Sequence, residues 1–155
     1  MKCIFLDIDG VLNNSKTFDS DFGYVGMDDE LVGRLKKITA ATNAKIYLIS
    51  SWKYGWYKEA DKKQEQDIFA DYLDSKFYSY GLIITDKLES GNSVFEFRGK
   101  LIKEFLQNNA VENFVILDDV KFDYIDEGFE NNLVLTNSKY GLTEKDVKKA
   151  IEILK

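Results

Sequence analysis

The chain has 155 residues, of which 45% are hydrophobic and 31% are charged, and its formal net charge is −6. This length and composition predict one globular domain over 1–155 and argue against a disordered chain. The negative charge argues against broad non-specific binding to a polyanion, although it leaves local binding to one open.

The counts of histidine and cysteine exclude several classes of enzyme. The chain has no histidine, so Ser-His-Asp and Cys-His nucleophiles and His-ligated zinc are excluded. The one cysteine, Cys3, lies in an apolar run and is expected to be a core residue without a disulfide, as in a reducing cytoplasm. The chain shows no signal peptide, and no run approaches the roughly 20 apolar residues of a membrane span. We therefore expect a cytoplasmic protein with no membrane partner.

Apolar periodicity predicts strands and helices that alternate along the chain. The expected elements are a strand over 2–6, a helix over about 29–41, a strand over 45–49, a helix from about 68 that includes Ile68, Phe69, Tyr72 and Leu73, a strand over 82–85, a helix from about 99, strands over 114–117 and 133–135, and a last helix with Thr143 as its N-cap. This order predicts an α/β fold with a mainly parallel, doubly wound, five-stranded sheet and helices on both faces.

Three of the expected strands are followed by residues suited to catalysis. Asp7 and Asp9 follow the first strand, Ser50-Ser51 follow the second, and Asp118-Asp119 follow the fourth. The carboxyl ends of parallel strands share one edge of the sheet, where open α/β sheets bind ligands, so neighbouring strands would bring these residues together. Acids held close together repel one another unless they share a cation or a proton. Such an edge suits a hard metal ion.

These segments resemble, in order, the four motifs of the haloacid dehalogenase (HAD) phosphatase superfamily. Asp-Ile-Asp-Gly-Val-Leu-Asn at 7–13 is similar to motif one, Ile-Ser-Ser-Trp-Lys at 49–53 to motif two, Phe-Arg-Gly-Lys-Leu-Ile at 97–102 to motif three, and Val-Ile-Leu-Asp-Asp at 115–119 to motif four. The resemblance spans 1–155 and is greatest to the small HAD domains of Swiss Army Knife RNA repair proteins. It implies a three-layer Rossmann-like core without a substantial cap domain.

The resemblance also implies a Mg²⁺-dependent phosphatase that works through an aspartyl-phosphate. Asp7 would be the nucleophile, and Asp9 would protonate the leaving oxygen and then activate water. The ion would be held by Asp7, by the main-chain carbonyl of Asp9 and by Asp118 or Asp119, with Asp119 favoured as the direct ligand. Ser50 would donate a hydrogen bond to the phosphoryl group.

Basic residues near the motifs are candidates for binding the phosphate. Lys100 is favoured as the motif-three cation, and Arg98 is the alternative because a guanidinium can bind a phosphate with two hydrogen bonds. Ser51 could replace Ser50 if the second strand runs one residue further. Within 52–58, where aromatic residues alternate with lysines, Lys53 is the residue expected to contact a substrate phosphate. That segment could stack on a nucleobase or could bury its rings in the core.

The spacing of the motifs limits the size of any cap domain and so indicates which substrates the site could admit. The stretch between Gly10 and Asp28 is too short for a cap domain, and 52–97 leaves room for a small flap at most. An open site admits large substrates, so phosphorylated nucleic-acid ends or nucleotides rank above free sugar phosphates. Two alternatives stay open, namely a phosphotyrosine-type protein phosphatase and a receiver-like module that accepts phosphate without hydrolysing it. Receivers carry the acceptor acid after the third strand, whereas Asp-x-Asp-Gly after the first strand favours hydrolysis.

Overall fold

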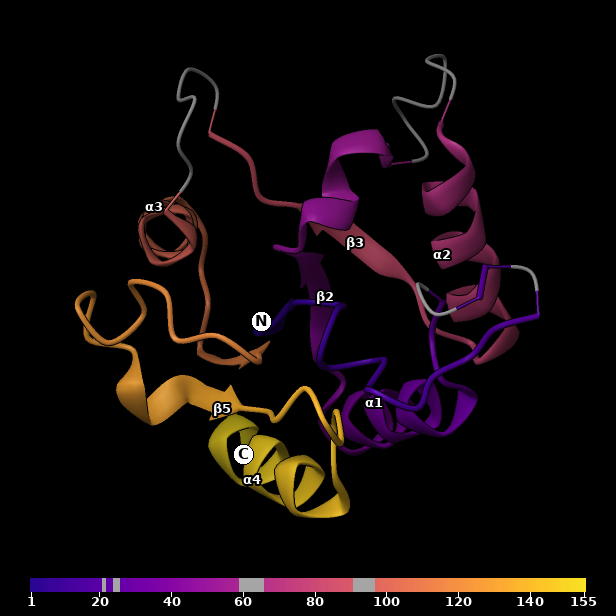
Figure 1. The fold of residues 1–155 in the computed structure, drawn as a ribbon. Helices are drawn as coiled ribbons and strands as arrows, with labels where there is room; N and C mark the ends of the chain where they lie inside the picture. The colour runs from indigo at the N-terminus through magenta and orange to yellow at the C-terminus, as the bar shows by residue number, and fades with distance from the viewer. Residues whose placement is uncertain (21, 24–25, 59–65, 91–96) are drawn as a thin grey trace.

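The computed structural model describes residues 1–20, 22–23, 26–58, 66–90 and 97–155. Strands and α-helices alternate along the described chain, as the sequence predicts (Figure 1). The strands are β1 (Lys2–Leu6), β2 (Lys45–Leu48), β3 (Ile84–Lys87), β4 (Asn113–Asp118) and β5 (Leu133–Leu135). The α-helices are α1 (Asp29–Thr42), α2 (Ile68–Ser79), α3 (Arg98–Asn108) and α4 (Glu144–Leu154), and two short 3₁₀ helices are η1 (Ser51–Gly55) and η3 (Glu130–Asn132).

The five strands form one parallel sheet in the order β3-β2-β1-β4-β5, which confirms the predicted fold class. Leu6 of β1 pairs with Leu48 of β2 and with Leu117 of β4, so these three strands end level. The order matches the doubly wound 3-2-1-4-5 arrangement, whose ligand crevice lies beside the first strand. Receivers have the order 2-1-3-4-5. Here β3 lies at the edge of the sheet, so the fold does not support the receiver interpretation.

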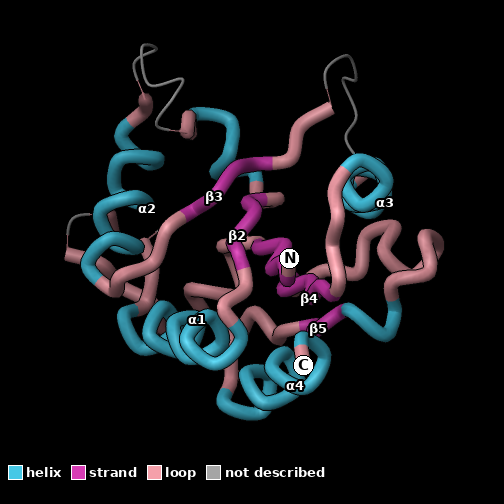
Figure 2. Tube along the Cα trace, turned by 180° about the vertical axis from the view of Figure 1, so that it is seen from behind, coloured by secondary structure: helices cyan, strands magenta, loops and turns pink. Residues whose placement is uncertain are grey.

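Helices cover both faces of the sheet. α1, α2 and α4 lie on one face and α3 lies on the other (Figures 1 and 2). Alternate residues of β1 enter the two cores, with Ile4 and Leu6 facing α1, α2 and α4, and Cys3 and Phe5 facing α3. Both faces of β1 are therefore buried, which explains its uninterrupted apolar sequence. Cys3 is a fully buried free cysteine, as predicted.

Local signals position the helices that flank the sheet. The Asp28 carboxylate caps α1 by accepting hydrogen bonds from the backbone N–H groups of Glu30 and Leu31. Thr143 and Asp146 cap each other's backbone at the start of α4, which confirms Thr143 as the N-cap. Such caps satisfy N–H groups that have no partner within the helix.

The start of the third strand differs from the prediction. β3 begins at Ile84 and not at residue 82, because the chain leaves α2 through a turn at residues 80–81, and Ile83 is 77% exposed. The predicted helix that includes Ile68 and Phe69 is present as α2, with these two residues exposed and a buried face formed by Ala70, Leu73 and Phe77.

The described residues between motifs two and three all belong to the three layers or to their connections. In this described part of the chain there is no separate cap domain. None of the described helices has the length and apolar character needed to cross a membrane.

Candidate active site

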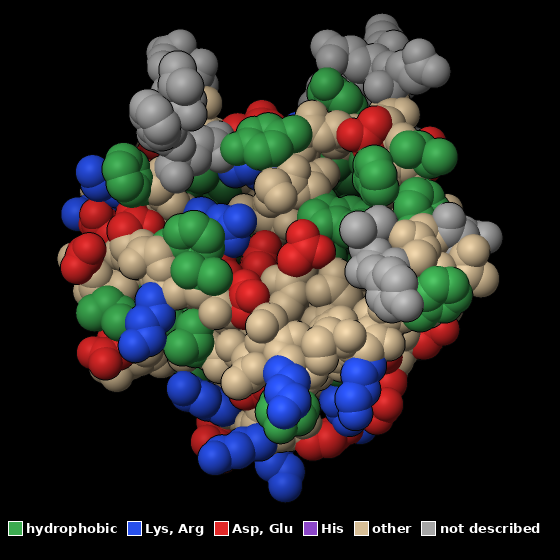
Figure 3. All heavy atoms as spheres, viewed as in Figure 1, with side chains coloured by type: hydrophobic (Ala, Val, Ile, Leu, Met, Phe, Trp, Pro, Cys, Tyr) green, Lys and Arg blue, Asp and Glu red, His purple; other side chains and the backbone are tan. Residues whose placement is uncertain are grey.

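Three carboxylates meet at the carboxyl edge of the central strands. One oxygen each of Asp7, Asp118 and Asp119 lies within 4.8 Å of the others. The Asp7 backbone N–H donates to the Leu117 carbonyl at 2.9 Å, so the pairing of β1 with β4 continues one residue further and places Asp7 at this edge. Figure 3 shows acidic side chains in a central hollow of this face, next to basic ones. The predicted convergence of the first and fourth strand ends is therefore confirmed.

Gly10 lets the backbone of motif one pass close to this carboxylate cluster. Its φ is +80°, and a Cβ at this position would lie 2.2 Å from Oδ2 of Asp119. The Gly10 carbonyl accepts a hydrogen bond of 2.7 Å from the buried Thr136 hydroxyl, which follows β5. A glycine is therefore needed both for the turn and for the space that the Asp119 carboxylate occupies.

Asp118 and Asp119 have different surroundings. Asp118 is fully buried, and its Oδ2 accepts hydrogen bonds from Arg98 Nη1 at 2.8 Å and from the Tyr124 hydroxyl at 2.6 Å. Its Oδ1 accepts from the Val120 N–H at 3.0 Å. Asp119 is only half-buried. Asp118 is thus an anchor held by protein donors, whereas Asp119 extends toward the solvent side of the cluster.

Arg98, the first residue of α3, is the cation in contact with the cluster. Its Nη1 lies 3.2 Å from Asp7 Oδ1 and 2.8 Å from Asp118 Oδ2. The guanidinium stacks over the Phe122 ring, 4.3 Å from its centroid. Phe122 has a φ of +40°, an unusual backbone conformation for a bulky residue. The guanidinium plane is therefore held between the acids and an aromatic ring.

Lys100, the cation favoured from the sequence, points elsewhere. Its side chain is exposed, and its Nζ lies 4.8 Å from the centroid of the Phe97 ring. Its backbone N–H donates to Asp123 at the start of α3. Among the described residues, the ion pairs of Asp7 include Arg98 but not Lys100.

The residues of motif two lie at the start of η1. Ser50 is fully buried, and its hydroxyl oxygen accepts a hydrogen bond of 3.2 Å from the Trp52 N–H. Ser51 is exposed. Lys53 is only 2% exposed, and its Nζ donates to the Leu88 carbonyl at 2.6 Å. Lys53 therefore ties η1 to the segment that follows β3.

Asp9 is exposed, and its carboxylate is held by two side chains. Oδ1 accepts from Asn13 Nδ2 at 2.9 Å, and Oδ2 accepts from Trp52 Nε1 at 3.2 Å. Asn13 also accepts from the Gly10 N–H and donates to the Gly26 carbonyl. The sequence analysis missed both partners of Asp9. The position of Asn13 four residues after Asp9, in the turn made by Gly10, was the available signal for one of them.

Burial and mutual repulsion shift the titration of this cluster. The pKa of Asp7 is raised to about 8, chiefly by burial and then by the charge of Asp118, while Arg98 opposes the shift. The pKa of Asp119 is also raised, first by burial and then by Asp118. Carboxylate oxygens are the ligands that Mg²⁺ prefers, and oxygens on opposite sides of this ion lie about 4 Å apart. The cluster therefore fits a divalent ion in both its chemistry and its size.

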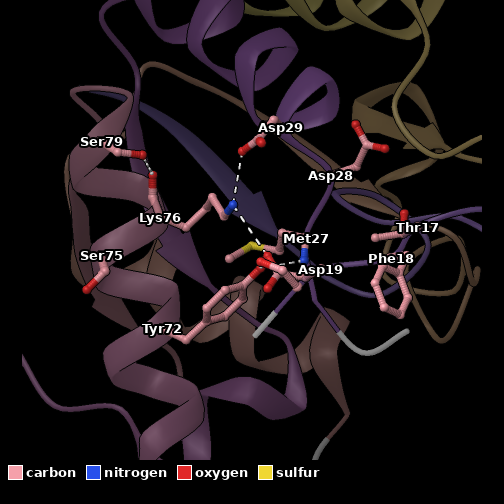
Figure 4. A pocket seen from close by; sticks show the side chains of 11 residues that line it. Thr17, Phe18, Asp19, Met27, Asp28, Asp29, Tyr72, Ser75, Lys76 and Ser79 are labelled. Atoms are coloured by element: carbon pink, nitrogen blue, oxygen red, sulfur yellow. Dashed lines mark hydrogen bonds and ion pairs between the residues drawn. The ribbon is translucent and has the colours of Figure 1, made fainter. Parts of the chain in front are cut away.

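A cavity of about 670 Å³ lies between α2 and residues 17–20 and 27–29, and none of the predicted site residues lines it (Figure 4). Lys76 Nζ lies 3.0 Å from Asp29 Oδ1 and 3.5 Å from Asp19 Oδ2. The Tyr72 hydroxyl donates to Asp19 and accepts from the Met27 N–H. These contacts attach Asp19 and Met27, which follow motif one, to α2.

Comparison with known protein families gives one result. The model of the HAD domain in Swiss Army Knife RNA repair proteins matches residues 3–147. This range contains all the acidic, hydroxyl and basic site residues described above. Neither the curated proteins nor the solved structures contain a significant match.

The crowding at Gly10 predicts that Gly10→Ala abolishes divalent-ion binding. Gly128→Ala is the matched control, because Gly128 has a φ of +85° but a Cβ there would meet nothing within 4 Å. Both variants should lose about 1–2 kcal/mol of stability from backbone strain. Only Gly10→Ala should also lose Mg²⁺ binding, measured by isothermal titration calorimetry. Equal affinities in the two variants would contradict the proposed crowding of Asp119.

The raised pKa of Asp7 predicts a specific pH dependence of stability. With a chelator present, the protonated Asp7 stabilises the fold at low pH, and this contribution is lost as the pH rises from 3.8 to about 8. The melting temperature of Asp7→Asn should therefore rise relative to that of the natural protein over this range. Mg²⁺ should reduce the difference, because a cation favours the charged carboxylate. If the melting temperatures of the two proteins with chelator change in parallel with pH, the raised pKa assigned to Asp7 is refuted.

Proposed function

The chain belongs to the family of HAD domains in Swiss Army Knife RNA repair proteins, and from this membership we propose that it is a Mg²⁺-dependent phosphatase. It would hydrolyse phosphomonoesters through an aspartyl-phosphate, with residues 1–155 acting as one domain in the cytoplasm. The observation that carries the proposal is the meeting of Asp7, Asp118 and Asp119 within 4.8 Å at the sheet edge.

Asp7 is the nucleophile in this proposal. Its carboxylate attacks phosphorus, the bond to the leaving oxygen breaks, and Asp9 gives that oxygen a proton. Asp9 then takes a proton from water, which attacks the phosphorus of the aspartyl-phosphate and releases phosphate and free Asp7. The hydrogen bonds from Asn13 and Trp52 support this role, because they fix the direction of an exposed carboxylate.

Asp7, the main-chain carbonyl of Asp9 and Asp119 would hold the ion. Asp119 is preferred over Asp118 because Arg98, Tyr124 and the Val120 N–H already donate to Asp118. When bound, Mg²⁺ would neutralise the repulsion between the nucleophile and the phosphate.

Arg98 takes the role of the motif-three cation, in place of Lys100. Its ion pair with Asp7 supports this assignment, and its remaining N–H groups could donate to phosphate oxygens. The Ser50 hydroxyl, whose oxygen already accepts from Trp52, would donate its proton to the phosphoryl group, with exposed Ser51 as the alternative donor. The buried Lys53 would act on the phosphate through its charge.

The proposed substrate is the phosphorylated end of a nucleic acid or a nucleotide. The family is named for RNA repair proteins. The absence of a separate cap in the described part of the chain leaves the acidic cluster in an open hollow, which suits the end of a long polymer (Figure 3).

Changes at the two acids of motif one should separate their roles. With an aryl phosphate and Mg²⁺, Asp7→Asn should abolish turnover because the nucleophile is lost. Asp9→Asn should lower kcat by about 100- to 10,000-fold, the usual contribution of general acid–base catalysis. Because only the main-chain oxygen of Asp9 is assigned to the ion, calorimetry should find nearly unchanged Mg²⁺ binding in Asp9→Asn. Loss of the ion in that variant would rule out the assignment.

A second pair of variants tests the basic residue of motif three. Arg98→Ala should lower kcat/KM by about 100- to 1,000-fold, the scale of losing one donor to a charged transition state. Lys100→Ala is the matched control, because the exposed Lys100 side chain lies two residues further along the same helix. A larger loss in Lys100→Ala than in Arg98→Ala would reverse the assignment.

A further inference from the structure

A second, smaller cavity opens directly beside Asp9. Its volume is about 280 Å³, and η1 and the start of α2 supply most of its wall. The rings of Trp52, Tyr54 and Phe69 line it together with the carboxylates of Asp9 and Asp67. We refer to this cavity as the aromatic pocket. It is near the lower limit of the roughly 300–1,000 Å³ typical of ligand sites, so it suits one ring system.

The position of Asp9 defines what this pocket would hold. In the proposed function, on which this inference rests, Asp9 protonates the oxygen that leaves phosphorus. The group attached to that oxygen must therefore lie on the Asp9 side of the site. Trp52 joins the two regions, since its Nε1 donates to Asp9 at 3.2 Å while its ring lines the pocket. The aromatic pocket is thus placed to receive the leaving group.

The walls of the pocket suit a flat aromatic occupant. Tyr54 is 61% exposed and Phe69 is 45% exposed, although both are large aromatic residues. The rings of Trp52 and Phe69 meet edge to face, with centroids 6.0 Å apart and an interplanar angle of 79°. Exposed ring faces of this kind stack on nucleobases in proteins that bind single-stranded nucleic acids.

Asp67 adds a polar feature that distinguishes among aromatic rings. Its Oδ1 accepts from the Ala70 N–H at 2.8 Å and caps α2. Its Oδ2 lies against Gly55, where a Cβ would be only 1.7 Å away. No hydrogen bond to Oδ2 is found within the described ranges, and Asp67 is exposed. An ionised carboxylate only accepts hydrogen bonds, so its ligand must supply N–H or O–H groups.

We propose that the aromatic pocket binds the nucleobase of the leaving nucleoside and that it favours guanine. Guanine presents neighbouring N–H donors on its Watson–Crick edge, which a carboxylate can accept as a pair. The ring of a phosphotyrosine carries no such donor. A further phosphate in the pocket would be repelled by both Asp9 and Asp67.

The test compares guanosine monophosphates, uridine monophosphates, ribose 5-phosphate and a phosphotyrosine peptide, with the phosphate of each nucleotide at the 3′ or the 5′ position. The natural protein should hydrolyse a guanosine monophosphate with a kcat/KM at least about 10-fold above that for ribose 5-phosphate, because stacking contributes. Phe69→Ala should reduce this ratio. Tyr78→Ala is the matched control, since Tyr78 is an 83% exposed ring on the same helix outside the aromatic pocket.

Asp67→Asn tests the polar contact without removing the helix cap, because Asn and Asp are equivalent N-caps. This variant should lose the preference for guanosine over uridine monophosphate. Retention of that preference, or a stronger preference for the phosphotyrosine peptide, would overturn the proposal.

Binding of guanosine, which has no phosphate, separates this inference from the proposed function. Calorimetry should detect guanosine binding to the natural protein and weaker binding to Asp67→Asn. If no phosphate ester is hydrolysed but guanosine binds in this way, the phosphatase proposal is wrong and the proposal of a guanine-binding pocket is supported. If ribose 5-phosphate and guanosine monophosphates are hydrolysed equally and guanosine does not bind, the proposal that the pocket binds guanine is wrong and the phosphatase proposal is supported.

Discussion

The proposed site depends on the repulsion among three carboxylates that the fold holds close together. Asp7, Asp118 and Asp119 are brought together by strands β1 and β4, and the parallel sheet does not let them separate. Burial and proximity raise the pKa of Asp7 to about 8, which shows how unfavourable the charged form is at this edge. A bound divalent cation or a bound proton reduces this repulsion, so the cluster favours binding either a cation or a proton.

The rest of the fold holds these acids in place. The two hydrophobic cores fix the sheet, and the level ends of β1, β2 and β4 fix where the loops begin. Arg98 and Tyr124 donate to Asp118 from the side of α3, and Gly10 leaves space for Asp119. On the other side, Tyr72 and Lys76 of α2 fasten the segment that carries Asn13, which in turn holds Asp9. Each layer of the fold thus contributes to one part of the site.

Much of this could be predicted because the signals are local. Apolar runs gave the strands, apolar periodicity gave α1, the Thr143 cap gave the start of α4, and acids after strands gave the edge of the sheet where the site lies. Features that depend on tertiary packing could not be predicted in this way. The sequence predicts the helix that contains Ile68 and Phe69, but not that its buried face is formed by Ala70, Leu73 and Phe77. Two basic residues at one helix start, Arg98 and Lys100, cannot be ranked from sequence, because the rotation of α3 determines which one contacts Asp7.

The segment after β2 also contains residues whose roles could not be assigned from the sequence. Its aromatic residues could be assigned to the core or to a ligand, and the structure divides them: Trp56 is buried, whereas Trp52 donates to Asp9. Its basic residue Lys53 lies inside the protein, where its long side chain binds the Leu88 carbonyl. Composition alone could not separate these roles, since the three-residue turn of η1 directs Lys53 and Trp56 inward and Tyr54 outward.

Chemical trapping of a phosphorylated Asp7 tests the central claim most directly. The protein is mixed with a phosphate ester and Mg²⁺, quenched during turnover and treated with borohydride, which reduces an acyl phosphate to an alcohol. Mass spectrometry of the peptide that contains residues 3–16 should then identify homoserine at position 7. An unmodified Asp7 during active turnover, or reduction at another acid such as Asp119, would contradict the account.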